Sequence, residues 1–149
     1  MKRVLLTTPQ NFTPAVNVSG CYCEWQDKIL LVKRHPDDTN GNTWGVPSGT
    51  MEKDETIEEC VIREVKEEVS LTITYEKLKY VGNLCIILRK DFGFIYHMFR
   101  FPFSSCPNVV LDLKENIESK WVTIEDALKH DLIFGAKEAF LQYKHHLSF

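Results

Sequence analysis

Hydrophobic and polar residues recur with a helical period in the middle of the chain. Between Ile57 and Val69, apolar residues return at intervals of three and four, which places them on one broad face of a helix. Thr56 precedes this run and Glu59 follows it by three residues, a pairing typical of a capping box. The pattern predicts an amphipathic helix that begins after Thr56 and continues to Val69.

Most other apolar runs are rich in β-branched and aromatic residues, which favours strands. Strands are expected at six ranges: 3–7, 15–25, 28–34, 77–89, 92–103 and 120–123. Gln26-Asp27 should turn the first hairpin, and Gly82 should make a strand irregular. The run 92–103 is apolar on both faces, so it is expected inside the sheet.

Two more helices are expected towards the C-terminus. Residues 124–128 open a short helix, and residues 134–147 form a longer one whose start Gly135 should weaken. The longer helix carries one apolar stripe, which consists of Ala136, Ala139, Phe140, Tyr143 and Leu147.

Three glutamates of the central helix lie at or beside the edge of its apolar face: Glu64, Glu67 and Glu68. An unpaired carboxylate turned towards a core is costly, and three together repel one another. A hard divalent cation removes both problems, because Mg²⁺ and Mn²⁺ bind carboxylate oxygens. The alternative is an acidic, solvated helix face, and spacing alone leaves both interpretations open.

Composition fits one globular domain that spans residues 1–149. Hydrophobic residues make up 44% and charged residues 26%, which are ordinary values. The net charge of -3 gives no electrostatic case for nucleic-acid or membrane binding. The five cysteines show no zinc-like CxxC pair, and Cys21 and Cys23 are too close on one strand for a disulfide. No stretch is long enough to span a bilayer, so a reducing, cytoplasmic location is expected.

The segment from Gly49 to Leu71 resembles the signature of the Nudix hydrolases. That signature reads Gly, five residues, Glu, seven residues, Arg-Glu-aliphatic-x-Glu-Glu-x-Gly-aliphatic. Every fixed position matches except Ser70, where the family has glycine. A residue just past a helix end usually takes the left-handed conformation, so serine there should cost about 1 kcal/mol. Ser48 stands where many members have a second glycine.

The order of elements also resembles the Nudix fold, an α/β/α sandwich with a mixed central sheet. Trp44, Pro47 and Gly49 match the short strand that precedes the signature, and the stretch from Trp121 to Leu128 matches a downstream element. The resemblance thus extends over most of the chain.

The resemblance implies metal-dependent hydrolysis of a diphosphate bond in a small nucleotide, either a nucleoside diphosphate derivative or a nucleoside triphosphate. It gives metal ligands at Glu64, Glu67, Glu68 and the backbone carbonyl of Ser48, with Mg²⁺ or Mn²⁺ as the ion. It assigns hydrogen-bonding roles to Arg63 and Glu55. An additional base is expected from the loop before Trp121, with Glu115 preferred over Glu118.

Other interpretations stay open. A nucleotide-binding sensor on the same fold would usually have lost signature carboxylates, and this chain keeps all of them. An isoprenoid diphosphate isomerase would need a catalytic cysteine, whereas Cys60 lies in the helix stripe and is expected in the core. His97 is likewise expected as a satisfied core histidine. Neither the proline marker of ADP-ribose enzymes nor the tyrosine marker of dinucleoside polyphosphate enzymes is present, and assembly into a homodimer is left open.

Overall fold

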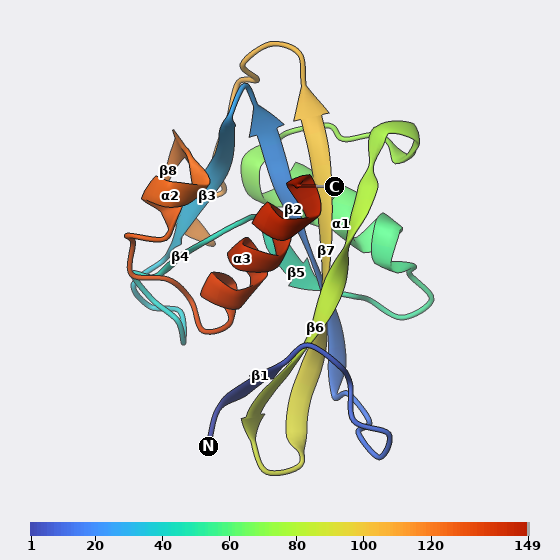
Figure 1. Cartoon of the computed structure of the whole chain (residues 1–149). Helices are drawn as coiled ribbons and strands as arrows, with labels where there is room; N and C mark the ends of the chain where they lie inside the picture. Colours follow the sequence, from blue (N-terminus) through green and yellow to red (C-terminus); the bar gives the residue numbers. More distant parts are fainter. Residues whose placement is uncertain (149) are drawn as a thin grey trace.

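The computed structural model describes residues 1–148 as one mixed sheet with helices on both faces (Figure 1). The helices are α1 (Ile57–Val69), α2 (Ile124–Ala127) and α3 (Ala136–Leu147), with a 3₁₀ turn at Tyr75–Lys77. The strands are β1 (Arg3–Leu5), β2 (Val16–Trp25), β3 (Lys28–Arg34), β4 (Trp44–Gly45), β5 (Ser48–Thr50), β6 (Lys79–Arg89), β7 (Phe92–Phe103) and β8 (Asn116–Val122).

The sheet has the strand order β1-β6-β7-β2-β3-β4, with β5 paired to β2 and β8 paired to β3. The pair β2 and β7 is parallel and the other pairs are antiparallel. The expected inner position of residues 92–103 is confirmed, because β7 lies between β6 and β2. Gly82 has a φ of 147° where the β6–β7 register shifts, which confirms the predicted irregularity.

Helices α1 and α3 cover opposite faces of this sheet, so the predicted α/β/α sandwich is correct (Figure 1). The α1 face is filled by aliphatic and aromatic residues that include Val61, Val65, Phe99 and Phe101. Cys60 is fully buried on α1, as expected. The charged side chains of α1 therefore lie along the border of this core.

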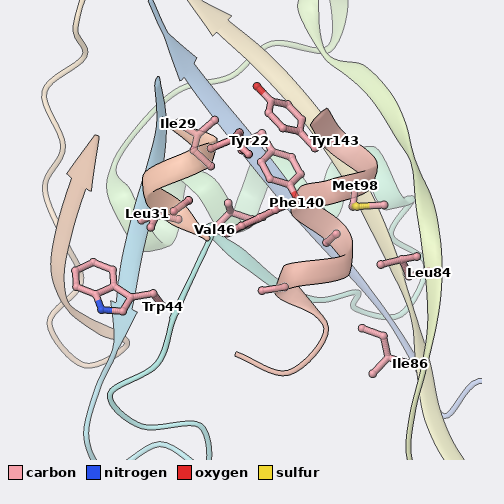
Figure 2. Packing of buried hydrophobic residues seen from close by; sticks show 14 residues of the cluster. Tyr22, Ile29, Leu31, Trp44, Val46, Leu84, Ile86, Met98, Phe140 and Tyr143 are labelled. Carbon is pink, nitrogen blue, oxygen red and sulfur yellow. The ribbon is translucent and has the colours of Figure 1, made fainter. Parts of the chain in front are cut away.

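The α3 face holds the larger aromatic cluster (Figure 2). The rings of Tyr22 and Tyr143 stack with centroids 4.1 Å apart, and Phe140 packs edge-on against Tyr22. Gly135 occupies the N-cap of α3 with a φ of 91°, a left-handed conformation that suits glycine. Gly135 was predicted to weaken the start of this helix, and the helix begins at the next residue, Ala136.

Several predicted boundaries were wrong by a few residues. β1 ends at Leu5 instead of residue 7, and α3 starts at Ala136 instead of residue 134. The strand expected at 120–123 begins earlier, at Asn116, because its first residues pair with the end of β3. Leu147 is 45% exposed and does not join the packing stripe, since it lies in the last turn of the helix.

One buried carboxylate, Glu24 on β2, shows how this protein compensates a buried negative charge. Arg100 donates two hydrogen bonds to it, from Nε at 2.9 Å and from Nη2 at 3.1 Å. The hydroxyl of Tyr143 donates a third. Glu24 is thus paired with a cation and multiply hydrogen-bonded, which is how a buried carboxylate is tolerated.

Ser70 has the left-handed conformation expected at the end of α1, with φ 62° and ψ 28°. Its hydroxyl donates a 2.9 Å hydrogen bond to the carbonyl oxygen of Val110, in the loop that leads to β8. The strain of a serine at this position is therefore offset by a contact that glycine cannot make.

Ser70→Gly is expected to change the free energy of unfolding by less than about 0.5 kcal/mol, because relief of strain offsets the lost hydrogen bond. Ser70→Ala should destabilise by about 1 kcal/mol, because the strain stays and the hydrogen bond is lost. Urea denaturation of the three proteins measures both values. Equal destabilisation by the two variants would contradict this explanation.

Candidate active site

Arg63 is the centre of a cluster of carboxylates at the border of α1. Its Nε and Nη2 atoms form a fork on Glu55, at 2.7 and 3.0 Å. Its Nη1 atom reaches Glu64 at 2.8 Å and Glu67 at 3.2 Å, and its Nε lies 3.2 Å from Glu52. One guanidinium therefore holds four carboxylates, and the local charge remains strongly negative.

The fork on Glu55 is the strongest contact of this cluster. The hydrogen bonds from Arg63 lower the pKa of Glu55 to about 2. Glu55 also accepts a 2.9 Å hydrogen bond from the backbone N–H of Glu52, so it ties the loop before α1 to the helix. Arg63 Nη2 further donates to the carbonyl oxygen of Thr50 at 3.1 Å, which fixes the same loop.

Gly49 allows the carboxylate of Glu64 to lie close to the backbone of β5. A Cβ atom at Gly49 would overlap the carboxylate of Glu64, so only glycine leaves room for that side chain. The thiol of Cys60 donates to the carbonyl oxygen of Gly49 at 3.4 Å, which holds the backbone of β5 against α1. The carboxylate of Glu64 thus lies directly against the backbone next to Ser48.

Glu68 is the most deeply buried carboxylate of α1, with 3% of its surface exposed. Burial raises its pKa well above the usual value, and the neighbouring Glu64 carboxylate adds to the effect. Burial also raises the pKa of Glu64. Among residues 1–148, no Lys, Arg or His forms an ion pair with Glu68. Unlike Glu24, this buried carboxylate has no cation of its own.

The single side-chain donor to Glu68 in residues 1–148 is Asn116, whose Nδ2 lies 3.1 Å from Glu68 Oε1. The loop before β8 is tied to the end of α1 through backbone hydrogen bonds: Asp112 N–H donates to Glu68 O at 3.0 Å, and Val110 N–H donates to Val69 O at 3.1 Å. These bonds bring the start of β8 to the carboxylate cluster. Sequence reasoning missed Asn116 because an isolated asparagine in a polar run carries no local signal.

The two candidate bases lie on either side of Asn116. Glu115 is exposed, and its carbonyl oxygen accepts a 2.9 Å hydrogen bond from the N–H of His35. Glu118 is exposed and pairs with Lys33 of β3. Val32, the residue before Lys33, faces α1, so Lys33 and its partner Glu118 face away from α1. A role for Glu115 as a base stays a prediction, and the geometry disfavours Glu118.

The donor chemistry of the cluster suits a divalent cation, but the side chains are not gathered for one. Within residues 1–148, no three His, Cys, Asp or Glu side chains converge on a ready-made metal site. Arg63 explains this, because its Nη1 atom holds both Glu64 and Glu67 and so competes with any cation. The uncompensated burial of Glu68 is what a cation at this place would relieve.

An apolar cavity of about 90 Å³ lies on the α3 face of the sheet, beside β5. Its lining includes Val18, Ser48, Phe94, Tyr96 and Ile133. Ser48 lines this cavity while its neighbour Gly49 contacts Glu64, so the cavity and the carboxylates meet at β5. Tyr22 does not line this cavity and is fully buried in the core (Figure 2). His97 is half-buried and contacts Asn17 and Tyr80, as expected of a satisfied histidine.

The family model described as the NUDIX domain matches residues 13–143 of the chain. The protein belongs to the Nudix family. The match covers the whole carboxylate cluster and both core faces, so the resemblance inferred from the residues between Gly49 and Leu71 is confirmed. No helix in residues 1–148 combines the length and the apolarity needed to cross a membrane.

Two curated proteins are similar in sequence to this Nudix protein. It is 47% identical over 58 residues to an ADP-ribose pyrophosphatase of Methanocaldococcus jannaschii, a match of 39% of this chain and 33% of the relative. It is 27% identical over 111 residues to the uncharacterized Nudix hydrolase YvcI of Bacillus subtilis, a match of 73% of this chain and 66% of that protein. The chain thus spans a third to two thirds of the length of these relatives.

Solved structures confirm the Nudix fold. A MutT protein from Methanosarcina mazei Go1 superposes with a TM-score of 0.79 at 23% identity, over 91% of this chain and 97% of that one. The NUDIX domain of Shewanella oneidensis NrtR, complexed with ADP ribose, superposes with a TM-score of 0.74 at 19% identity, over 95% and 94% of the two chains.

Proposed function

We propose that this Nudix protein hydrolyses a diphosphate bond in a nucleoside diphosphate derivative or a nucleoside triphosphate, with Mg²⁺ or Mn²⁺. The observation that carries the proposal is the buried Glu68 carboxylate, which has no ion-pair partner within residues 1–148 and lies next to Glu64 in a signature that keeps all of its carboxylates. Glu64, Glu67 and Glu68 would hold the ion, with the backbone carbonyl of Ser48 beside them. A bound ion supplies charge neutralisation on the phosphate oxygens and a more acidic water.

The chain's own residues would organise the reaction around that ion. Arg63 orients Glu64 while its fork on Glu55 fixes the loop that carries Thr50. A carboxylate of the cluster accepts a proton from the attacking water, whose oxygen forms the new bond to phosphorus as the phosphoanhydride bond breaks. Glu115 is the proposed additional base, because it lies next to the residue that contacts Glu68.

The apolar cavity beside Ser48 would hold part of the substrate outside the diphosphate. We rank ADP-ribose first among candidate substrates, although the proline marker of ADP-ribose enzymes is absent from this chain. The support is that one relative carries the name ADP-ribose pyrophosphatase and that one structural neighbour was solved with ADP ribose. We rank oxidised nucleoside triphosphates second, supported by 29% identity over 56 residues to an 8-oxo-dGTP diphosphatase of Proteus vulgaris.

The test is a substrate panel that contains ADP-ribose, nucleoside triphosphates with 8-oxo-dGTP, nucleotide sugars and dinucleoside polyphosphates. Each is incubated at alkaline pH with Mg²⁺ or Mn²⁺, and phosphate is measured after a coupling phosphatase or pyrophosphatase. We expect metal-dependent hydrolysis of at least one class. Absence of hydrolysis with intact nucleotide binding would favour a nucleotide-binding sensor module on the same fold.

Binding of Mg²⁺ is expected to stabilise the protein even without substrate, because the ion relieves the desolvated Glu68 charge. At ten times its Kd, Mg²⁺ should add about 1.4 kcal/mol, or roughly 4 °C in Tm. Thermal melting with and without the ion measures the shift, and Glu58→Gln, a substitution in the first turn of α1, should retain it. A Tm that does not respond to Mg²⁺ or Mn²⁺ would contradict the metal assignment.

A further inference from the structure

Asn116 opens β8 with 0% of its surface exposed, yet its amide is only half satisfied. Nδ2 donates to Glu68 Oε1 at 3.1 Å, whereas the buried Oδ1 has no hydrogen-bond partner within residues 1–148. Leaving a buried amide oxygen without a donor is costly, and buried polar atoms are rarely left so. Oδ1 therefore needs a donor that the described part of the chain does not provide.

A second unpartnered atom lies on the adjacent strand. Arg34 of β3 is the register partner of Asn116, at the point where the pairing of β3 and β8 shifts. Its Nη2 donates a hydrogen bond to Asp38 at 2.9 Å, while its Nε is buried and has no partner among the described residues 1–148. Arg34 is also near enough for its charge to act on Glu68. Within residues 1–148, an unused donor on Arg34 and an unused acceptor on Asn116 therefore lie at paired positions of β3 and β8, and Asn116 contacts Glu68.

A water molecule bound between the two paired positions would satisfy both atoms, since it can accept from Arg34 Nε–H and donate to Asn116 Oδ1. An aliphatic side chain at position 116 would also fill the space, because the core on this face holds apolar residues such as Val32 and Trp121. Apolar residues are the usual occupants of fully buried positions. The polarity of Asn116 is thus explained by what it does to Glu68.

We propose that Asn116 is a positioning residue for Glu68. Its Nδ2 donor fixes one carboxylate oxygen and so the direction in which Glu68 offers the other to a divalent cation. Its Oδ1 binds a water molecule at the edge of that site. The inference rests on the proposed function, because it needs Glu68 to be a metal ligand. Removal of such supporting hydrogen bonds weakens metal binding by about 10–100-fold in other metal sites.

The test measures binding of Mn²⁺ to the metal-free protein by titration calorimetry, without substrate. Asn116→Leu, which removes both amide groups at similar volume, is expected to raise the Kd at least about tenfold. Asn116→Ala should raise the Kd to a similar extent, and it replaces the leucine variant in the test if that variant does not fold. Tyr143→Phe is the matched control, because it removes one donor from the other buried carboxylate, Glu24, and should leave the Kd for Mn²⁺ unchanged.

A double-mutant cycle with Glu68→Gln separates positioning from a general structural role. Once Glu68 is replaced, Asn116→Leu should change the Kd by less than about twofold, because the pair is coupled. An equal loss in both backgrounds would overturn the positioning role. Wild-type protein that binds no Mn²⁺ would overturn the proposed function instead. Wild-type binding with unchanged affinity in both Asn116 variants would overturn this inference alone.

Discussion

Glu68→Gln is expected to raise the activation barrier for the best substrate of the panel by about 3 kcal/mol. This lowers kcat/KM by a factor on the order of 100 or more. Glutamine keeps the shape of the side chain and can still accept the hydrogen bond from Asn116 Nδ2. It removes the charge that would hold the divalent cation against the developing charge on phosphate. Initial rates at saturating Mg²⁺ measure the loss.

The same substitution should not destabilise the metal-free protein. Replacing a buried, uncompensated carboxylate with a neutral amide removes a desolvation cost, so Tm without metal should stay constant or rise. Glu58→Gln, in the first turn of α1, is the control and should retain kcat/KM. Full activity of Glu68→Gln would show that Glu68 is not part of the site.

The central helix could be predicted from the sequence because its determinants are local. Thr56 and Glu59 form the capping box, with hydrogen bonds of 2.8 and 3.0 Å, and the periodic apolar residues set which face is buried. The burial of Glu68 follows from its spacing relative to Ile57 and Val61 on that face. The left-handed Ser70 follows from its place just past the helix end.

The surroundings of Glu68 could not be predicted in the same way. Asn116 lies 48 residues from Glu68, and it arrives there through the β3–β8 register and the hydrogen bonds of the preceding loop. A shift of one residue in that register would have turned another side chain towards α1. From the sequence, an acidic residue was expected at this place, with Glu115 preferred over Glu118, whereas the register brings the neutral Asn116 to Glu68.

The sequence likewise did not predict which of the two buried carboxylates pairs with a cation. Glu24 and Arg100 lie on different strands, and the parallel pairing of β2 with β7 brings their side chains together. Tyr143 adds its hydrogen bond from α3. The comparison between a compensated Glu24 and an uncompensated Glu68 therefore requires the folded structure, and this comparison supports the proposal that Glu68 binds a metal ion.

Arg63→Ala is expected to cost about 2 kcal/mol of unfolding free energy at pH 7, because it leaves Glu55 and Glu64 without their cation. This magnitude takes into account that a quarter of the guanidinium side chain is exposed to solvent. Arg63→Lys should recover less than half of the loss, because an ammonium cannot make the fork on Glu55. Urea denaturation of both variants measures the difference from wild type.

The cost of Arg63→Ala should shrink in acid, and the sign follows from Glu55. Arg63 lowers the pKa of Glu55 from 4.5 to about 2, so the stabilisation is complete above 4.5 and is lost as the pH falls towards 2. Wild type and variant should therefore converge between pH 4.5 and pH 2, where the carboxylate becomes protonated. A difference in unfolding free energy that stays constant from pH 7 to pH 3 would mean that packing of the Arg63 side chain, and not its pairing with Glu55, stabilises the loop before α1.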